Sequence, residues 1–92
     1  MEWKLFADLA ETVGGKRVPV EAEPGDTVGD ALEALLDDHP GLEERVLDDG
    51  ELADHVNLLR NGTNVYTGEG KGLDTELEAG DELALFPPVS GG

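Results

Sequence analysis

The most constraining feature of this sequence is a single apolar stripe between residues 27 and 39. Apolar residues recur at the i, i+3, i+4, i+7 and i+8 positions that share one face of an α-helix: Val28, Ala31, Leu32, Leu35 and Leu36. Thr27 can cap the start of this helix, and Asp30 three residues later completes a capping-box pattern. Pro40 ends the helix, because proline pushes the preceding His39 out of the helical region. The sequence predicts one long helix, which needs one sheet face to bury its apolar side.

The segments around this helix alternate apolar and polar residues, as strands do. We expect strands at residues 3–7, 17–20, 56–60 and 82–86, and a return strand that begins at residue 65. Pro19 cannot donate a ladder hydrogen bond, so its strand is expected at a sheet edge. Asn61-Gly62 is the dipeptide that most favours a tight hairpin turn.

The remaining segments are short helical turns and loops. Residues 9–13 show helical spacing before Gly14-Gly15, residues 42–51 favour a short helical turn plus loop, and residues 68–72 form a glycine-rich loop. The element order predicts an α+β fold in which a mixed four- to five-stranded sheet packs on one main helix. The 92 residues make one domain. We expect it to span residues 1–86, with residues 87–92 as a flexible C-terminal tail.

The charge excludes several classes of partner. Six Lys and Arg residues stand against 22 Asp and Glu residues, for a net charge of −16. A nucleic-acid phosphate backbone or an anionic membrane surface needs a basic face, which six cations cannot supply. Asp37 and Asp38 even fall at a helix C-terminus, where the dipole disfavours anions. Molar salt would screen most of this repulsion. We interpret the acids as a salt-adapted surface; ordinary acidity and mimicry of a nucleic acid remain as alternatives.

The sequence lacks residues for cysteine chemistry and for a histidine metal site. The chain has no cysteine, and its two histidines, His39 and His55, have no partners at metal-ligand spacing. A domain this small buries only roughly 60–65% of its unfolded surface, which leaves no deep catalytic cleft. The N-terminus lacks a basic segment followed by an apolar run, and no apolar stretch approaches the roughly 20 residues of a membrane span. We expect a cytoplasmic protein that is no enzyme, has no catalytic residues and binds no metal or cofactor.

The C-terminus carries the chemical signal. Gly91-Gly92 follows a diproline and two further residues. Because neither glycine has a side chain, the terminal carboxylate can pass through a narrow channel into another protein's active site. A carboxylate is a poor electrophile until it is adenylated, after which it can acylate an amine or accept sulfur. The alternative interpretation is an unstructured end in which the glycines occur by chance.

Several segments together resemble one family. The run Leu77-Glu78-Ala79-Gly80-Asp81-Glu82-Leu83-Ala84-Leu85-Phe86-Pro87-Pro88-Val89-Ser90-Gly91-Gly92 is similar to the end of the molybdopterin synthase small subunit and of the archaeal ubiquitin-like small modifier proteins. The opening segment 4–9, the start of the helix at 27–32 and segment 54–62 are similar too. With its acid enrichment, the chain looks like a haloarchaeal small modifier protein. The resemblance implies the β-grasp fold.

The resemblance also implies a mechanism. An E1-like activating enzyme would use ATP to adenylate Gly92, and Gly91 would permit access to that enzyme's channel. Partner enzymes would contact a segment made of Phe86, Pro87, Pro88 and Val89, in which the prolines hold the tail away from the body. Compared with the bacterial sulfur carriers, the chain has a longer glycine-rich segment at residues 68–75.

Two functions follow from this chemistry. In the first, which we favour, the protein is a modifier that is joined by isopeptide bonds to lysines of target proteins. In the second, it is the sulfur-carrier subunit of molybdopterin synthase, and its thiocarboxylate is consumed by the large subunit. A non-covalent acidic binding module needs no diglycine and ranks last. If the modifier is itself modified, Lys16 and Lys71 are the candidate acceptors, because both lie beside glycines in expected loops.

Overall fold

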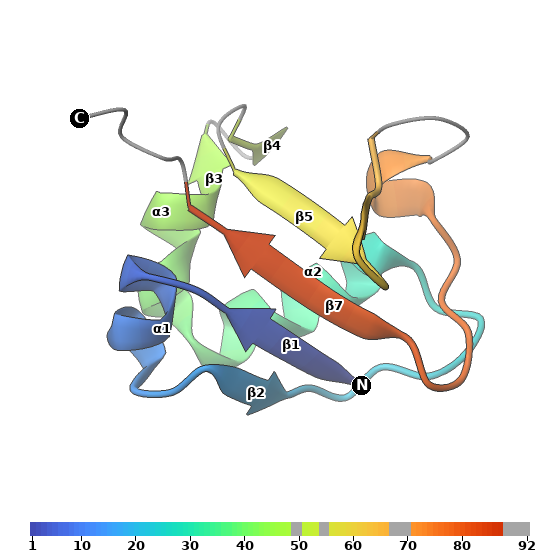
Figure 1. The fold of residues 1–92 in the computed structure, drawn as a ribbon, viewed down its shortest axis with the longest axis horizontal. Coiled ribbons are helices and arrows are strands. Elements are labelled where there is room, and N and C mark those ends of the chain that lie inside the picture. Colours follow the sequence, from blue (N-terminus) through green and yellow to red (C-terminus); the bar gives the residue numbers. More distant parts are fainter. Residues whose placement is uncertain (49–50, 54–55, 67–70, 88–92) are drawn as a thin grey trace.

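A mixed five-stranded sheet forms the framework of the protein (Figure 1). The computed structural model describes residues 1–48, 51–53, 56–66 and 71–87. Its strand order is β2-β1-β7-β5-β6. The strands are β1 Glu2–Leu5, β2 Arg17–Pro19, β5 Asn57–Arg60, β6 Thr63–Asn64 and β7 Glu82–Phe86. Strands β1 and β7 run parallel and the other pairs run antiparallel, so the mixed sheet predicted from the sequence is confirmed.

The long helix is α2, Val28–Asp38, and it begins as predicted. The backbone N–H of Asp30 donates to Thr27 Oγ1 at 3.2 Å, and the backbone N–H of Thr27 donates to Asp30 Oδ2 at 3.0 Å. These reciprocal bonds satisfy two amide groups that a helix start leaves unpaired. At the other end, His39 has φ −133°, which is outside the helical region, as expected before Pro40.

The core lies between α2 and one face of the sheet. The residues of the predicted stripe are buried, except Leu36, which is half-buried. The sheet supplies alternate residues of its central strands to this core: Trp3, Leu5, Leu58, Leu83 and Leu85. The indole N–H of Trp3 donates to the carbonyl of Ala31 at 3.1 Å, which ties β1 to α2 and satisfies the buried donor.

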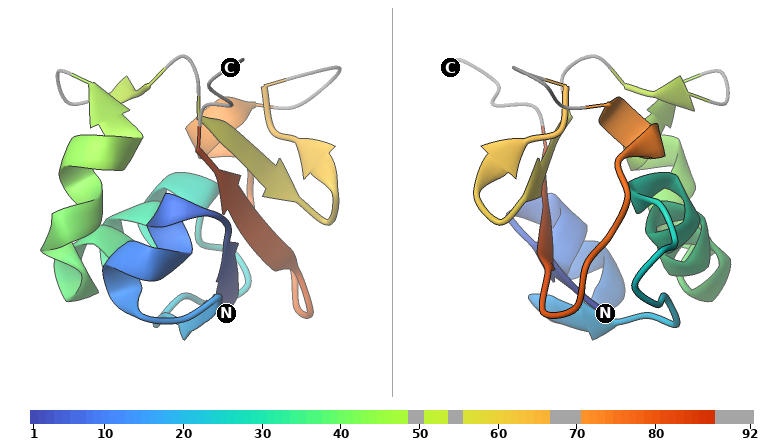
Figure 2. Two further views of the ribbon diagram at one scale, coloured as in Figure 1. Left: turned by 60° about the vertical axis from the view of Figure 1, so that its left-hand side comes forward. Right: turned by 90° about the vertical axis from the view of Figure 1, so that its right-hand side faces the viewer.

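Short elements complete the α2 side of the sheet (Figure 2). They are α1 Asp8–Val13, the 3-10 helix η1 Pro40–Leu42, α3 Glu43–Val46 and the 3-10 helix η2 Gly72–Asp74. A small antiparallel pair, β3 Leu47–Asp48 and β4 Glu51–Leu52, follows α3. The helical turns at 9–13 and within 42–51 are confirmed, whereas the β3–β4 pair was not anticipated.

Two predicted strands have different bounds in the structure. The first ends at Leu5, because Ala7 has φ 53° and turns the chain into α1. The return strand is β6 and precedes Val65, although the Val65 N–H still donates to the Leu58 carbonyl at 3.1 Å. The edge position of Pro19 is confirmed, since β2 pairs with β1 alone. Most of the glycine-rich loop lies outside the described residues.

Candidate functional site

The C-terminal segment starts from the middle of the sheet. Strand β7 lies between β1 and β5 and pairs with both along its length. Phe86 ends this strand, and Pro87, which cannot donate a ladder hydrogen bond, follows it. A strand with two neighbours is the most firmly held kind of strand, so the point at which the chain leaves the sheet is fixed in space.

Two aromatic rings mark this exit point. Strand β7 turns Leu83 and Leu85 toward the core and therefore turns Phe86 to the opposite, open face of the sheet. The ring of Phe6 stacks on that of Phe86 with 4.1 Å between centroids and 9° between planes. Aromatic pairs of this kind contribute about 0.5–1.5 kcal/mol beyond the area they bury. Both rings are half-buried and remain accessible to a partner.

Two smaller side chains extend this aromatic pair across the sheet. Ala84 shares its face with Phe86, two residues away, and lies directly opposite Leu59 of β5. All four residues are half-buried. We call this surface the apolar strip: Phe6, Leu59, Ala84 and Phe86. It ends where the C-terminal segment leaves the sheet.

The charged residues beside the apolar strip are paired. Lys4 Nζ lies 2.6 Å from Glu82 Oε1, and Arg17 Nη1 lies 2.9 Å from Glu2 Oε1. The hydrogen bond from Lys4 lowers the pKa of Glu82 below its ordinary value. These four groups belong to the open face, because their neighbours Trp3, Val18 and Leu83 point into the core. The chain has a net charge of −16, but these two ion pairs leave this face without net charge from its four paired groups. This face therefore repels an acidic partner less than the rest of the surface does.

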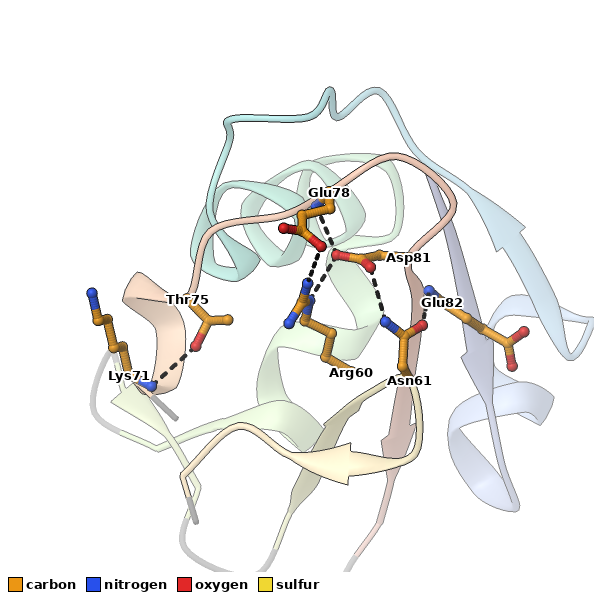
Figure 3. A network of polar contacts seen from close by, with 7 residues as sticks. All are labelled: Arg60, Asn61, Lys71, Thr75, Glu78, Asp81 and Glu82. Atoms are coloured by element: carbon orange, nitrogen blue, oxygen red, sulfur yellow. Dashed lines mark hydrogen bonds and ion pairs between the residues drawn. The ribbon is translucent and has the colours of Figure 1, made fainter. Parts of the chain in front are cut away.

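A polar network fixes the start of β7 (Figure 3). The Asp81 carboxylate accepts from Arg60 Nε at 2.7 Å, from the Glu78 backbone N–H at 2.7 Å and from Asn61 Nδ2 at 2.8 Å. Asn61 Oδ1 in turn accepts from the Glu82 backbone N–H at 2.9 Å. The turn between β5 and β6 is thereby joined to the turn before β7.

Burial and hydrogen bonding act in opposite directions on Asp81, whose side chain is 5% exposed. Burial raises the pKa of Asp81, but hydrogen bonds from Arg60, the Glu78 backbone and Asn61 outweigh it and hold the pKa below its ordinary value. The same hydrogen bond raises the pKa of Arg60. The network is therefore charged at neutral pH and holds one end of β7 in place, while the Phe6–Phe86 stack lies at the other end.

The structure places some of the predicted site residues and not others. Phe86 and Pro87 are half-buried at the end of the sheet, and their role in partner binding stays a prediction. Pro88, Val89, Gly91 and Gly92 lie outside the described residues. Sequence reasoning missed Phe6, Leu59 and Ala84 as members of the apolar strip. The available signal was strand alternation, which turns Phe6 away from its buried neighbour in β1.

The candidate acceptor lysines are both exposed. Lys16 precedes β2, and Lys71 precedes η2, where its backbone N–H donates to Thr75 Oγ1 at 3.2 Å. Within the described residues, neither ammonium group pairs with a carboxylate, in contrast to Lys4.

Other site classes find no support in the part of the chain that the structure describes. Across residues 1–48, 51–53, 56–66 and 71–87, no group of three or more His, Cys, Asp or Glu side chains is placed to hold a metal ion. Over the same ranges, no helix combines the length and the apolar character that crossing a membrane requires.

Comparison with known proteins identifies the family of this chain. Residues 3–92 match the ThiS family. The chain is 60% identical over 93 residues to small archaeal modifier protein 1 of Haloferax volcanii, with both chains covered completely. It is 35% identical over 72 residues to the sulfur carrier protein CysO of Mycobacterium tuberculosis, with 74% of each chain covered.

The solved structures agree. The crystal structure of SAMP1 from Haloferax volcanii superimposes with a TM-score of 0.87 at 58% identity and covers 100% of this chain and 98% of its own. The β-grasp fold implied by the resemblance is therefore confirmed. The acid-rich surface also fits a similarity to a Haloferax protein. The chain belongs to the ThiS family and, within it, is similar to ubiquitin-like small archaeal modifiers and to sulfur carriers.

Proposed function

We propose that this protein is a ubiquitin-like modifier. Its C-terminal Gly92 is activated by an E1-like enzyme and joined by an isopeptide bond to lysines of target proteins. The observation that carries the proposal is the identity of 60% to a small archaeal modifier over the full length of the chain. In the structure, the C-terminal segment leaves the sheet at the end of the half-buried apolar strip, which agrees with this role. The protein acts as the substrate of other enzymes and contributes no catalytic residue of its own.

The reaction follows from the chemistry of a terminal carboxylate. The activating enzyme joins the Gly92 carboxylate to AMP from ATP, and pyrophosphate leaves. The deprotonated amine of a target lysine attacks the activated carbonyl, an amide bond forms, and AMP leaves. Gly91 and Gly92 suit this role because they fit a narrow channel. ATP is used by the partner enzyme, and the protein itself needs no bound cofactor.

The apolar strip is the surface that the activating enzyme would contact. Phe6, Leu59 and Phe86 offer a partly exposed apolar patch at the root of the reacting segment. Aromatic residues, phenylalanine included, are enriched at protein–protein interfaces. Docking on this strip would place the enzyme beside the exit of the C-terminal segment.

A second candidate function shares the first activation step. In a sulfur carrier, a sulfide-level sulfur nucleophile attacks the carbonyl of the adenylated Gly92, a C–S bond forms and AMP leaves. The resulting thiocarboxylate is consumed by a partner such as the molybdopterin synthase large subunit. The similarity to the sulfur carrier CysO favours this possibility. We prefer the modifier, because that relative is less similar and matches only 74% of the chain.

Mass spectrometry of trypsin-digested lysate separates the two functions. No Lys or Arg follows Lys71, so a conjugated target lysine would carry the whole segment of residues 72–92. Such branched peptides are expected for a modifier and are expected to vanish in cells whose protein lacks Gly91 and Gly92. Thiocarboxylate on the free protein, with no branched peptide under any growth condition, would overturn the modifier in favour of the carrier.

A further inference from the structure

A second apolar surface lies on the α2 side of the molecule, away from the apolar strip. It is a shallow groove of about 260 Å³, lined by residues of α2, of η2 and of the segment of α3 and β3. Its apolar lining comes from all three elements, and we call it the leucine groove: Leu32, Leu36, Leu47 and Leu73. Among the described residues, its lining includes none from the open sheet face. Nothing in the proposed reaction uses this surface.

Two elements that line the groove lie in close backbone contact. A Cβ on Gly29 would lie 3.1 Å from the carbonyl oxygen of Leu73 and 3.3 Å from its Cβ, so glycine lets η2 approach α2 closely. Leu32 forms a floor that is only 3% exposed, whereas the other leucines are half-buried. The groove thus combines a packed floor with accessible walls, as a binding surface does.

Three carboxylates border the leucine groove: Glu33 and Asp37 from α2, and Glu43 from α3. All three are exposed, and none pairs with a cation in the described part of the chain. Here the molecule differs from the open sheet face, where the acids have basic partners. The last turn of α2 also contains no basic residue, so its carbonyl ends add to the negative potential beside Asp37.

We propose that the leucine groove binds a segment of a partner protein that carries apolar side chains flanked by lysine or arginine. The apolar side chains would enter the groove, and the basic groups would face Glu33, Asp37 and Glu43. The volume is below the roughly 300–1,000 Å³ of small-molecule pockets, which suits side chains rather than a whole metabolite.

Charge disfavours the other occupants. The chain's own residues 87–92 contain no cation, so they offer no group that pairs with the acidic border. A second copy docked in the same way would bring two acidic borders together. A basic segment is the one occupant whose charge complements this border.

The test is a titration of the full-length ¹⁵N-labelled protein with a synthetic helical peptide. The peptide carries leucines at i and i+4 and lysines beside them, and a matched peptide has glutamates in place of the lysines. In about 1 M KCl the Debye length is about 3 Å, so only charges in direct contact act. We expect the lysine peptide to shift the amide signals of residues 29–37, 47 and 73, and the glutamate peptide to bind at least threefold more weakly.

A pair of charge variants isolates the acidic border. The first triple variant removes this border and carries Glu33→Gln, Asp37→Asn and Glu43→Gln. The second removes the same charge from exposed positions elsewhere and carries Glu11→Gln, Glu21→Gln and Glu23→Gln. We expect the first triple variant to weaken peptide binding roughly three- to tenfold, and the second to leave it within about twofold. Urea unfolding of both variants shows that each is folded.

Four outcomes would overturn the proposal. They are equal binding of the two peptides, equal effects of the two triple variants, shifts confined to the open sheet face, and the absence of binding. Groove signals that move with protein concentration alone would assign the groove to a second copy. Groove signals that move when residues 88–92 are removed would assign it to the chain's own end. None of these results depends on the reaction at Gly92. The test of the leucine groove is therefore independent of the proposed function.

Discussion

Asp81 offers the sharpest test of how the start of β7 is held. Its carboxylate is almost fully buried and accepts three hydrogen bonds, each between 2.7 and 2.8 Å. Hydrogen bonds to a charged group contribute about 1.5–3 kcal/mol each and neutral ones about 0.5–1.5 kcal/mol. Because the Arg60 side chain is 26% exposed and can regain water, the loss is smaller than the sum of these terms. We expect Asp81→Ala to lower the free energy of unfolding by about 2–4 kcal/mol.

The matched control is Asp38→Ala, which removes the same charge. Asp38 is exposed at the end of α2, where the dipole disfavours an anion, so its removal is expected to leave stability unchanged or slightly higher. Urea unfolding in about 2 M KCl, followed by circular dichroism, measures both variants with the repulsion screened. Equal effects of the two substitutions would refute the reasoning, since the loss would then reflect charge and not the network.

Comparison of the wild type with Asp81→Asn gives a pH dependence with a defined sign. The pKa of Asp81 is below its ordinary value, so its stabilisation is fully present above the unfolded pKa of about 3.9. This stabilisation is lost as the pH falls through the lower, folded pKa. The difference between wild type and Asp81→Asn is therefore expected to be constant above about pH 5 and to shrink below about pH 4. A difference that grows on acidification would contradict the assigned hydrogen bonds.

Four further predictions follow. Leu32→Ala is expected to cost about 2–5 kcal/mol in urea unfolding, because Leu32 is buried in the middle of α2; a loss below about 0.5 kcal/mol would show that α2 does not pack as described. The unfolding midpoint is expected to rise from dilute buffer to about 2 M KCl, as repulsion in a chain of net charge −16 is screened; equal midpoints would refute a salt-adapted surface. Deletion of Gly91 and Gly92 is expected to abolish every conjugate in an assay with activating enzyme and ATP, with an unchanged circular dichroism spectrum; persisting conjugates would rule out Gly92 as the reacting end. Chains, if they form, are expected on Lys16 or Lys71 ahead of the paired Lys4, and peptide mapping that finds only Lys4 would contradict this.

Local signals in the sequence identified the elements whose causes are local. The Thr27–Asp30 capping box lies within four residues, and the Asn61-Gly62 turn needs only two positive φ angles, which the structure shows as 52° and 83°. The apolar stripe of α2 follows in the same way from the helical period. These features were confirmed because few alternatives compete with them.

Features that depend on contacts between distant segments could not be predicted from local sequence patterns. The two-residue strands β3 and β4 carry too few residues for a periodic pattern. Phe6 meets Phe86 only because β1 pairs in parallel with β7, and Leu59 joins them only through the register of β5. The leucine groove depends on the close approach of Leu73 to Gly29, which nothing in either local sequence indicates. Sequence reasoning thus predicted a reacting end at Gly91 and Gly92 with Phe86 near it, but not the other residues of the apolar strip.

The placement of the few cations gives the two faces of the molecule opposite responses to salt. Lys4 and Arg17 lie on the open sheet face, where they form ion pairs with Glu82 and Glu2. Docking of an acidic enzyme on the apolar strip is therefore opposed mainly by repulsion from the net charge of the whole chain, which salt screens, so molar salt should strengthen it. The leucine groove keeps its acids unpaired, and salt should weaken its attraction for a basic segment. Salt alone would then distinguish the two partners. As the salt concentration rises, the affinity of an enzyme at the reacting end rises, whereas the affinity of a basic partner on the α2 side falls.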